Sequence, residues 1–111
     1  MEQKYILSRN EFVSFNLKWT NLIVRKNLKF WEKIKNDDII IFTNHYDKNT
    51  LKVKIKASHV YDNLDTILFK FKDIKLYPHS LSKNNCKQVL KIKLNYYTEA
   101  PIKVMEFIIL D

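Results

Sequence analysis

The sequence predicts a small α+β domain: a strongly curved mixed sheet or small β-barrel with two to three helices packed on its side. Its 111 residues suit one domain, over residues 1–111, with one core. Hydrophobic residues make up 46% of the chain and aromatic residues 14%, enough for a packed interior. The predicted order is helix, three strands, two helices and a strand, which is not a repeated βαβ pattern and disfavours a doubly wound parallel sheet.

The first predicted element is a helix over residues 9–18. Ser8 and Glu11 have the spacing of a capping box, in which the Ser8 hydroxyl and the Glu11 carboxylate each meet a free backbone N–H. Apolar residues follow at near-helical spacing, namely Phe12, Phe15 and Trp19. Because Trp19 continues this stripe, we expect it to pack in the core rather than to stack on a base.

Two strands are predicted next. Residues 21–25 alternate, so Leu22 and Val24 should face the core, with Asn21, Ile23 and Arg25 on the other face. Residues 38–43 form a continuous apolar run of strand length, which is typical of a central strand. The polar residues 44–50 indicate a loop.

Strict alternation over residues 51–58 predicts the clearest strand of the chain. Its core side would carry Leu51, Val53, Ile55 and Ala57. Its other side would carry Lys52, Lys54, Lys56 and Ser58. A row of lysines about 7 Å apart could follow a phosphate backbone. The ordinary solvent-exposed face of a half-buried strand gives the same pattern and is the more common outcome.

The C-terminal half predicts two helices and a strand. A short helix should follow Asn63, residues 77–80 should form a turn, and Ser82 could cap a helix that runs to about Tyr97. Leu90, Ile92 and Leu94 could instead alternate as a strand, so this assignment stays open. Residues 102–110 predict a final, mostly buried strand.

The formal net charge of +8 bears on the partners of the protein. A positive field attracts nucleic acid or an anionic membrane surface. The richness in Lys, Asn and Ile also fits a coding sequence rich in A and T, which would account for part of the lysine excess without selection. Glycine is absent, which excludes a phosphate-binding P-loop, a dinucleotide-binding fingerprint and the usual nucleophile elbow.

Cysteine and histidine usage predicts neither a disulfide nor a metal site. Cys86 is the only cysteine, so an intramolecular disulfide is impossible and a reducing, intracellular compartment is expected. The three histidines lack metal-ligand spacing, so we expect no metal and no cofactor. Residues 1–9 show no signal-peptide pattern, and the longest apolar runs are too short to cross a bilayer, so no membrane association is expected.

Several segments, taken in order, resemble the ASCH domain of the PUA-like group. The matching segments are Arg25, residues 35–42 (Lys-Asn-Asp-Asp-Ile-Ile-Ile-Phe), and residues 53–61, 62–68, 77–82, 95–97 and 102–110. The resemblance covers nearly the whole chain, and its C-terminal half is the more persuasive part. It implies a PUA-like β-barrel and an RNA-binding cleft beside the first helix.

The chain departs from the family where the family strand reads Gly-x-Lys-Thr-x-Glu-x-Arg. Residues 18–25 retain only Arg25; Thr20 stands at the Lys position, Asn21 at the Thr position and Ile23 at the Glu position. Some ASCH relatives are similar to amidohydrolases of acylated cytidine that use those residues, so these replacements weigh against that activity. The family's Gly-Asp turn is Asp37-Asp38 here, so Asn36 or Asp37 must adopt any left-handed backbone.

Candidate binding residues follow from charge, aromatic content and the resemblance. Arg25 would grip a phosphate or stack on a base, although a structural salt bridge is the alternative. Basic residues surround Phe30 and Trp31 over residues 26–35, as single-stranded nucleic acid requires, and we expect Trp31 to be the exposed aromatic. The predicted nucleic-acid-binding set is Arg25, Lys18, Thr20, Asn21, Lys26, Lys29, Trp31, Lys33, His79 and Ser80.

The sequence therefore supports a nucleic-acid-binding module, with RNA as the expected partner and no catalytic residues assigned. One alternative is a small hydrolase or ribonuclease in the same cleft, which would need two titratable groups within hydrogen-bond reach of each other. The other is a protein-interaction domain that keeps only the scaffold, for which a large exposed apolar patch away from the cleft would be the sign.

Overall fold

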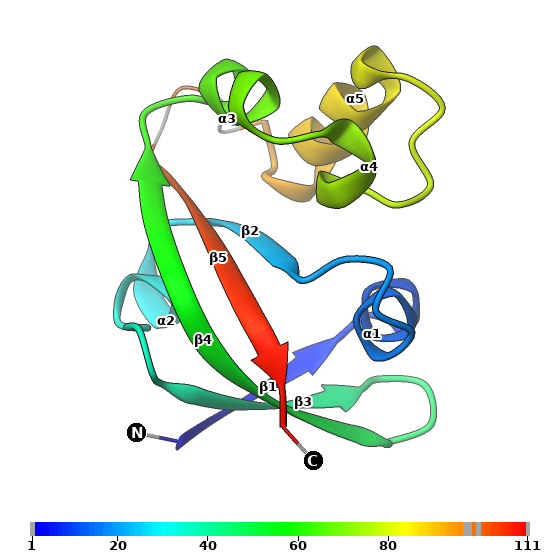
Figure 1. Ribbon diagram of the computed structural model, residues 1–111, viewed down its shortest axis with the longest axis vertical. Helices are drawn as coiled ribbons and strands as arrows, with labels where there is room; N and C mark the ends of the chain where they lie inside the picture. Colours follow the sequence, from blue (N-terminus) through cyan, green and yellow to red (C-terminus); the bar gives the residue numbers. More distant parts are fainter. Residues whose placement is uncertain (1, 97–98, 100, 111) are drawn as a thin grey trace.

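The computed structural model describes residues 2–96, 99 and 101–110, and its centre is a five-stranded mixed sheet curled into a half-barrel (Figure 1). The strand order is β1-β3-β4-β5-β2; β1 pairs with β3 in parallel, and the other neighbours are antiparallel. The bounds are β1 Glu2–Leu7, β2 Leu22–Lys26, β3 Ile39–Asn44, β4 Thr50–Tyr61 and β5 Ile102–Ile109. The predicted α+β class with a curved sheet is confirmed.

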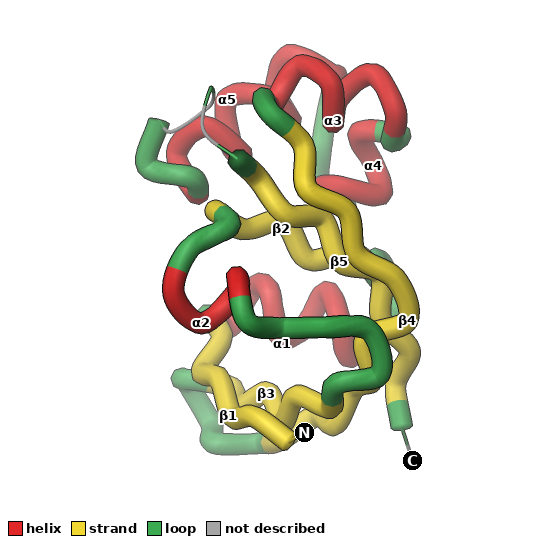
Figure 2. Tube along the Cα trace, turned by 90° about the vertical axis from the view of Figure 1, so that its left-hand side faces the viewer, coloured by secondary structure: helices red, strands yellow, loops and turns green. Residues whose placement is uncertain are grey.

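Five helices lie among the described residues: α1 Arg9–Asn16, α2 Lys29–Glu32, α3 Leu64–Lys70, α4 Asp73–Leu76 and α5 Lys83–Lys93. Figure 2 shows α3, α4 and α5 together at one end of the molecule, whereas α1 and α2 lie within the curl of the sheet. None of the helices in this part of the chain is long and apolar enough to cross a bilayer.

Strand β1 was missing from the predicted element order. Its residues alternate between exposed and partly buried, with Tyr5 and Leu7 facing inward. The strand is fixed by its parallel register with β3, in which Tyr5 lies opposite Phe42. A pairing across more than thirty residues of sequence leaves little local signal in so short a segment.

Side-chain caps define the C-terminal helices as predicted. The side-chain Oδ1 of Asn63 accepts from the Thr66 N–H (2.9 Å), and the Ser82 hydroxyl accepts from the Asn85 N–H (3.0 Å). Residues 90–94 lie at the end of α5, with Leu90 buried, so they do not form the alternative strand. The helix ends at Lys93; its predicted end, Tyr97, lies outside the described residues.

Strand β2 separates two apolar cores. Ile23 is fully buried in the core formed with α1, β1, β3 and β4, while Leu22 and Val24 pack against α3 and α5. The predicted division of these residues between two faces is confirmed, but both faces of the strand are buried. A strand buried on both faces has a nearly continuous apolar run, and β2 reads Leu-Ile-Val before Arg25.

A β-bulge in β4 corrects the predicted alternation. Ile55 pairs with Phe107, but the next pair is Ala57 with Glu106, so Lys56 is the extra residue. Consequently Ala57 is exposed rather than directed to the core. A bulge bends a strand and increases its twist, which allows β4 to run from the first core to the second.

The left-handed backbone expected at Asn36 or Asp37 lies at Asp37. Asp37 has φ of 73°, the left-handed conformation that glycine adopts without cost. The Asp38 carboxylate accepts from the Lys35 N–H (2.8 Å) and closes the turn into β3.

Lys103 is a buried lysine that the sequence did not single out. It lies in β5 with only 5% of its surface exposed, and its ammonium donates to the carbonyl oxygens of Trp31 (2.9 Å) and Ile34. These bonds tie α2 and the segment after it to the sheet. Burial lowers the pKa of Lys103, against an opposing effect of Asp38 and Glu32.

We predict a pH-dependent stability difference between the wild type and Lys103→Met. Because the folded pKa lies below the unfolded value of 10.5, the unfolded chain binds more protons between the two. The wild type should therefore gain stability relative to Lys103→Met as the pH rises from 7 towards 10.5. Urea unfolding of both proteins across this range measures the difference; a constant difference would contradict the assignment.

Candidate functional site

A cleft of about 170 Å³ opens beside α1, between β2 and the segment that joins α4 to α5. Polar side chains in its wall come from α1, β2, α5 and the segments beside them, and they include Glu11, Thr20, Arg25, Tyr77, His79 and Lys93. Its position agrees with the predicted cleft beside the first helix. Its wall is mixed in charge rather than uniformly basic.

One carboxylate joins three elements around this cleft. Glu11 Oε1 of α1 lies 2.5 Å from Arg25 Nη2 of β2, and Glu11 Oε2 lies 3.7 Å from Lys93 Nζ of α5. Only the first half of the predicted capping box is present. In it, Ser8 Oγ accepts from the Glu11 N–H (3.4 Å). The Glu11 carboxylate does not close the box, since Arg25 holds it.

The ion pair fixes the charge states of its members. Burial opposes the charged form of Glu11, but Arg25 and then Lys93 outweigh it, so the pKa of Glu11 lies below its usual range. Burial likewise opposes the charge of Arg25, and Glu11 reverses this effect and raises the pKa of Arg25. The cleft wall therefore holds two cations and one carboxylate.

Arg25 is held from several sides. Its Nη1 donates to the Val24 carbonyl oxygen (2.9 Å), and its guanidinium lies 5.2 Å from the Trp31 ring centroid and 6.0 Å from that of Tyr5. The structural salt bridge considered from the sequence is present. A ligand-binding role of Arg25 stays a prediction, with 18% of its side chain exposed at the cleft.

The prediction of Trp31 as the exposed aromatic is wrong. Its exposed fraction is 6%, and its ring packs against Tyr5 (centroids 4.7 Å apart) and Phe30 (4.8 Å). Tyr5 comes from β1, the strand that was not predicted, so no local pattern indicated the partner that buries Trp31.

Trp19 is exposed, contrary to the prediction that it continues the core stripe. Helix α1 ends at Asn16, and Lys18 takes a left-handed φ of 62°, which turns the chain before Trp19. The Trp19 ring is 45% exposed and meets the edge of His79, with centroids 5.3 Å apart. Trp19, His79, Pro78 and Ile74 line a shallow depression, and His79 and Pro78 also line the cleft.

The hydroxyls of Thr20 and Ser80 are engaged by backbone. Thr20 Oγ1 donates to the Lys75 carbonyl oxygen (2.5 Å) and accepts from the Leu22 N–H (3.1 Å), and the residue is buried. Ser80 Oγ donates to the Tyr77 carbonyl oxygen (2.6 Å) within the predicted turn. Thr20 lines the cleft, whereas Ser80 does not, and neither hydroxyl is free to act as a nucleophile.

The remaining predicted residues are divided between two regions. Lys18 and Asn21 are exposed on the segment between α1 and β2, next to Trp19 and Thr20. Lys26, Lys29 and Lys33 do not line the cleft and belong to β2 and the α2 region; Figure 1 shows α2 and α1 on opposite sides of the molecule. The basic segment 26–35 is therefore separate from the cleft.

Glu11, Tyr77 and Lys93 line the cleft but were not among the predicted binding residues. Glu11 was assigned to helix capping, and Tyr77 and Lys93 were not considered as binding residues. The distance from Lys93 to Glu11 depends on how α5 packs, and spacing along the chain does not reveal it. Among the residues that the structure describes, no group of three His, Cys, Asp or Glu side chains is arranged to hold a metal ion.

Comparisons with known proteins identify the fold alone. No family model matches the chain, and no curated protein matches it. The crystal structure of hypothetical protein PH0355 is similar over 99% of this chain and 100% of that one, with a TM-score of 0.82 and 21% identity. The solution NMR structure of protein PF0455 from Pyrococcus furiosus is similar over 100% of this chain and 99% of that one, with a TM-score of 0.75 and 22% identity. What they share with this chain is the half-barrel fold.

We predict that Glu11→Gln destabilises the protein by about 2 to 3 kcal/mol at pH 7, because Arg25 is left buried without a counter-ion. The contribution of a carboxyl with a lowered pKa is present above the unfolded value of 4.5 and is lost as the pH falls through the folded value. The difference from the wild type should therefore shrink in acid. Urea unfolding at pH 7 and pH 3 measures it.

Glu2→Gln is the matched control, since Glu2 is exposed and lies 3.8 Å from Lys52. Its effect should stay within about 0.5 kcal/mol. Equal effects of the two substitutions at pH 7 would show that the Glu11–Arg25 pair has no special weight.

Proposed function

We propose that the protein binds single-stranded nucleic acid, RNA by preference, through the cleft beside α1. The observation that carries this proposal is the exposed Trp19 ring, which stands against His79 at the mouth of a cleft walled by Arg25 and Lys93. Flat aromatic faces next to cations are what unpaired bases and phosphates require.

The dimensions of the cleft support a planar ring as ligand. A protein cavity of about 150 Å³ accommodates benzene, and the volume here is about 170 Å³. Trp19 would then stack a neighbouring base outside the cleft, while Lys18 beside it offers a charge to the backbone. Two cations against one carboxylate leave the wall positive, so affinity should fall with salt.

We further infer that the chain is a divergent ASCH domain. This inference is our reason for proposing RNA rather than DNA as the ligand. Support comes from the element order and from Arg25, the residue of the family strand that this chain retains, which lies in the cleft wall. The half-barrel fold is compatible with this membership, although fold alone does not determine function.

Two observations weigh against hydrolase activity in this cleft. The lowered pKa of Glu11 makes it a weak general base near neutral pH, where a base with a pKa near 7 is the most effective. The Thr20 hydroxyl is already bonded on both sides by backbone groups. Binding is therefore the function that the geometry supports best.

We predict that Trp19→Ala weakens binding of a fluorescein-labelled single-stranded RNA about 5- to 150-fold, because each stacked base contributes about 1–3 kcal/mol. Fluorescence anisotropy across a salt series measures it, with wild-type affinity falling as salt rises. Trp19 is already substantially exposed, so its removal should leave the fold intact.

The control is Phe69→Ala, since Phe69 on α3 is 88% exposed and lines neither the cleft nor the Trp19 depression. It should bind as the wild type does. Equal loss in both variants, or equal affinity of the wild type for RNA at low and high salt, would contradict the proposal.

A further inference from the structure

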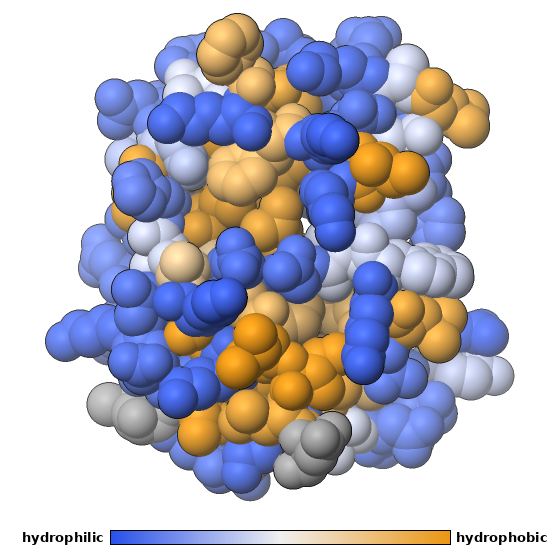
Figure 3. All heavy atoms as spheres, in the orientation of Figure 1, coloured by the Kyte–Doolittle hydropathy of each residue, from blue (hydrophilic) through white to orange (hydrophobic). Residues whose placement is uncertain are grey.

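The outer face of the half-barrel carries an aliphatic surface that no helix of the described chain covers. Side chains on this face alternate with the core residues of β3, β4 and β5. Figure 3 shows apolar side chains gathered over the lower part of the sheet, near the C-terminus. We call this surface the outer patch; its aliphatic members are Ile39, Ile41, Ile108 and Leu110.

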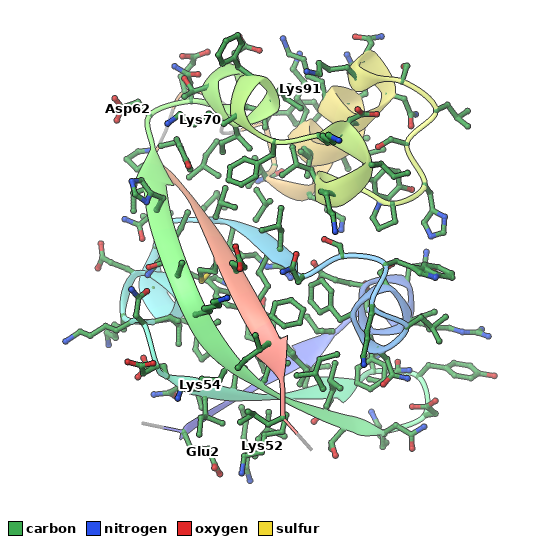
Figure 4. All side chains as sticks on the ribbon, viewed as in Figure 1. Glu2, Lys52, Lys54, Asp62, Lys70 and Lys91 are labelled. Carbon is green, nitrogen blue, oxygen red and sulfur yellow. The ribbon has the colours of Figure 1, made fainter. Side chains whose placement is uncertain are left out.

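The outer patch has a regular charge pattern. In the register, Ile41 lies opposite Lys52, and Lys54 lies between Ile39 and Ile108. The exposed lysines of β4 thus form a central column, with one aliphatic column on β3 and another on β5. Figure 4 shows Lys52 and Lys54 on this lower side of the molecule, together with Glu2.

Three acidic residues border the lysines of this face: Glu2, Asp37 and Glu106, of which Glu106 lies two residues before Ile108 in β5 and 4.0 Å from Lys56. Lys52 lies 3.8 Å from Glu2 on the edge strand β1, and Lys54 lies 3.7 Å from Asp37 in the turn before β3. These distances are long for ion pairs, and Lys52 and Lys54 remain 46% and 41% exposed. A carboxylate placed above the central column could therefore compete for both lysines.

The arrangement of lysines and aliphatic residues on the outer patch favours some binding partners over others. A second copy packed face to face about a two-fold axis along or across β4 would place lysines over lysines, which opposes association. The aliphatic residues beside Lys52 and Lys54 offer no aromatic ring on which a base could stack, which disfavours nucleic acid as the occupant. Lysine side chains flank the aliphatic residues, and of these four only Ile108 is more than partly exposed. Both features disfavour insertion into a bilayer.

A helix is the element that normally covers an apolar sheet face, and its dimensions suit the lysine column. Alternate residues of a strand are about 7 Å apart, and residues four apart on a helix are separated by about 6 Å along its axis. We propose that the outer patch binds an acidic amphipathic helix of a partner protein. Its carboxylates would lie along β4, and its aliphatic residues would enter the two flanking columns.

The test uses a fluorescein-labelled synthetic helix with Glu at i, i+4, i+7 and i+11 and Leu on both sides of this stripe. We expect anisotropy to show binding that the double variant Lys52→Glu/Lys54→Glu weakens at least tenfold. A second peptide with Lys in place of each Glu should bind the double variant and not the wild type. Such a charge swap separates recognition from a loss of folding.

The control is Lys91→Glu, a lysine at the helical end of the molecule (Figure 4), which should bind the acidic peptide as the wild type does. Vesicles of phosphatidylcholine with one quarter phosphatidylserine form the other arm. Absence of peptide binding, equal weakening by Lys91→Glu, or vesicle binding that the double variant abolishes would overturn the proposal.

Discussion

The cleft depends on one buried carboxylate. Glu11 reaches from α1 to Arg25 in β2, and Lys93 of α5 meets its second oxygen, so three elements that are distant in sequence converge on one residue. A buried ion pair adds little net stability compared with apolar packing, yet removing one partner leaves an uncompensated charge. The pair joins α1 to β2, and its importance lies in the cost of losing either partner.

The cleft has firm walls because β2 is packed on both sides. Ile23 anchors it in one core, and Leu22 and Val24 anchor it in the other. The bulge at Lys56 bends β4 along the curved sheet, so that this strand contributes to both cores. Lys103 of β5 donates to the Trp31 carbonyl oxygen and so ties α2 to β5. Arg25 projects from this fixed strand, and Trp31, itself held through its carbonyl oxygen by Lys103, lies beside its guanidinium.

Local patterns predicted most of the fold, and tertiary contacts account for the errors. Helix caps at Asn63 and Ser82 and the alternation of β4 are visible within a few residues. The exposure of Trp19 was not, because it depends on the left-handed turn at Lys18 that follows the end of α1. Trp31 was misassigned because its partner Tyr5 lies in β1, whose pairing with β3 is non-local.

The candidate site was located by its region but not by its chemistry. Of the predicted binding residues, Thr20, Arg25 and His79 line the cleft, and their role in binding stays a prediction; the carboxylate that holds Arg25 was assigned to a local cap. The most direct test of the cleft as the nucleic-acid site is ¹⁵N-resolved NMR of the protein titrated with a short single-stranded RNA. The account predicts shifts at the Trp19 indole N–H and the Lys18 and His79 amides. Shifts confined to the outer face around Lys52 and Lys54, or no shifts at low salt, would contradict it.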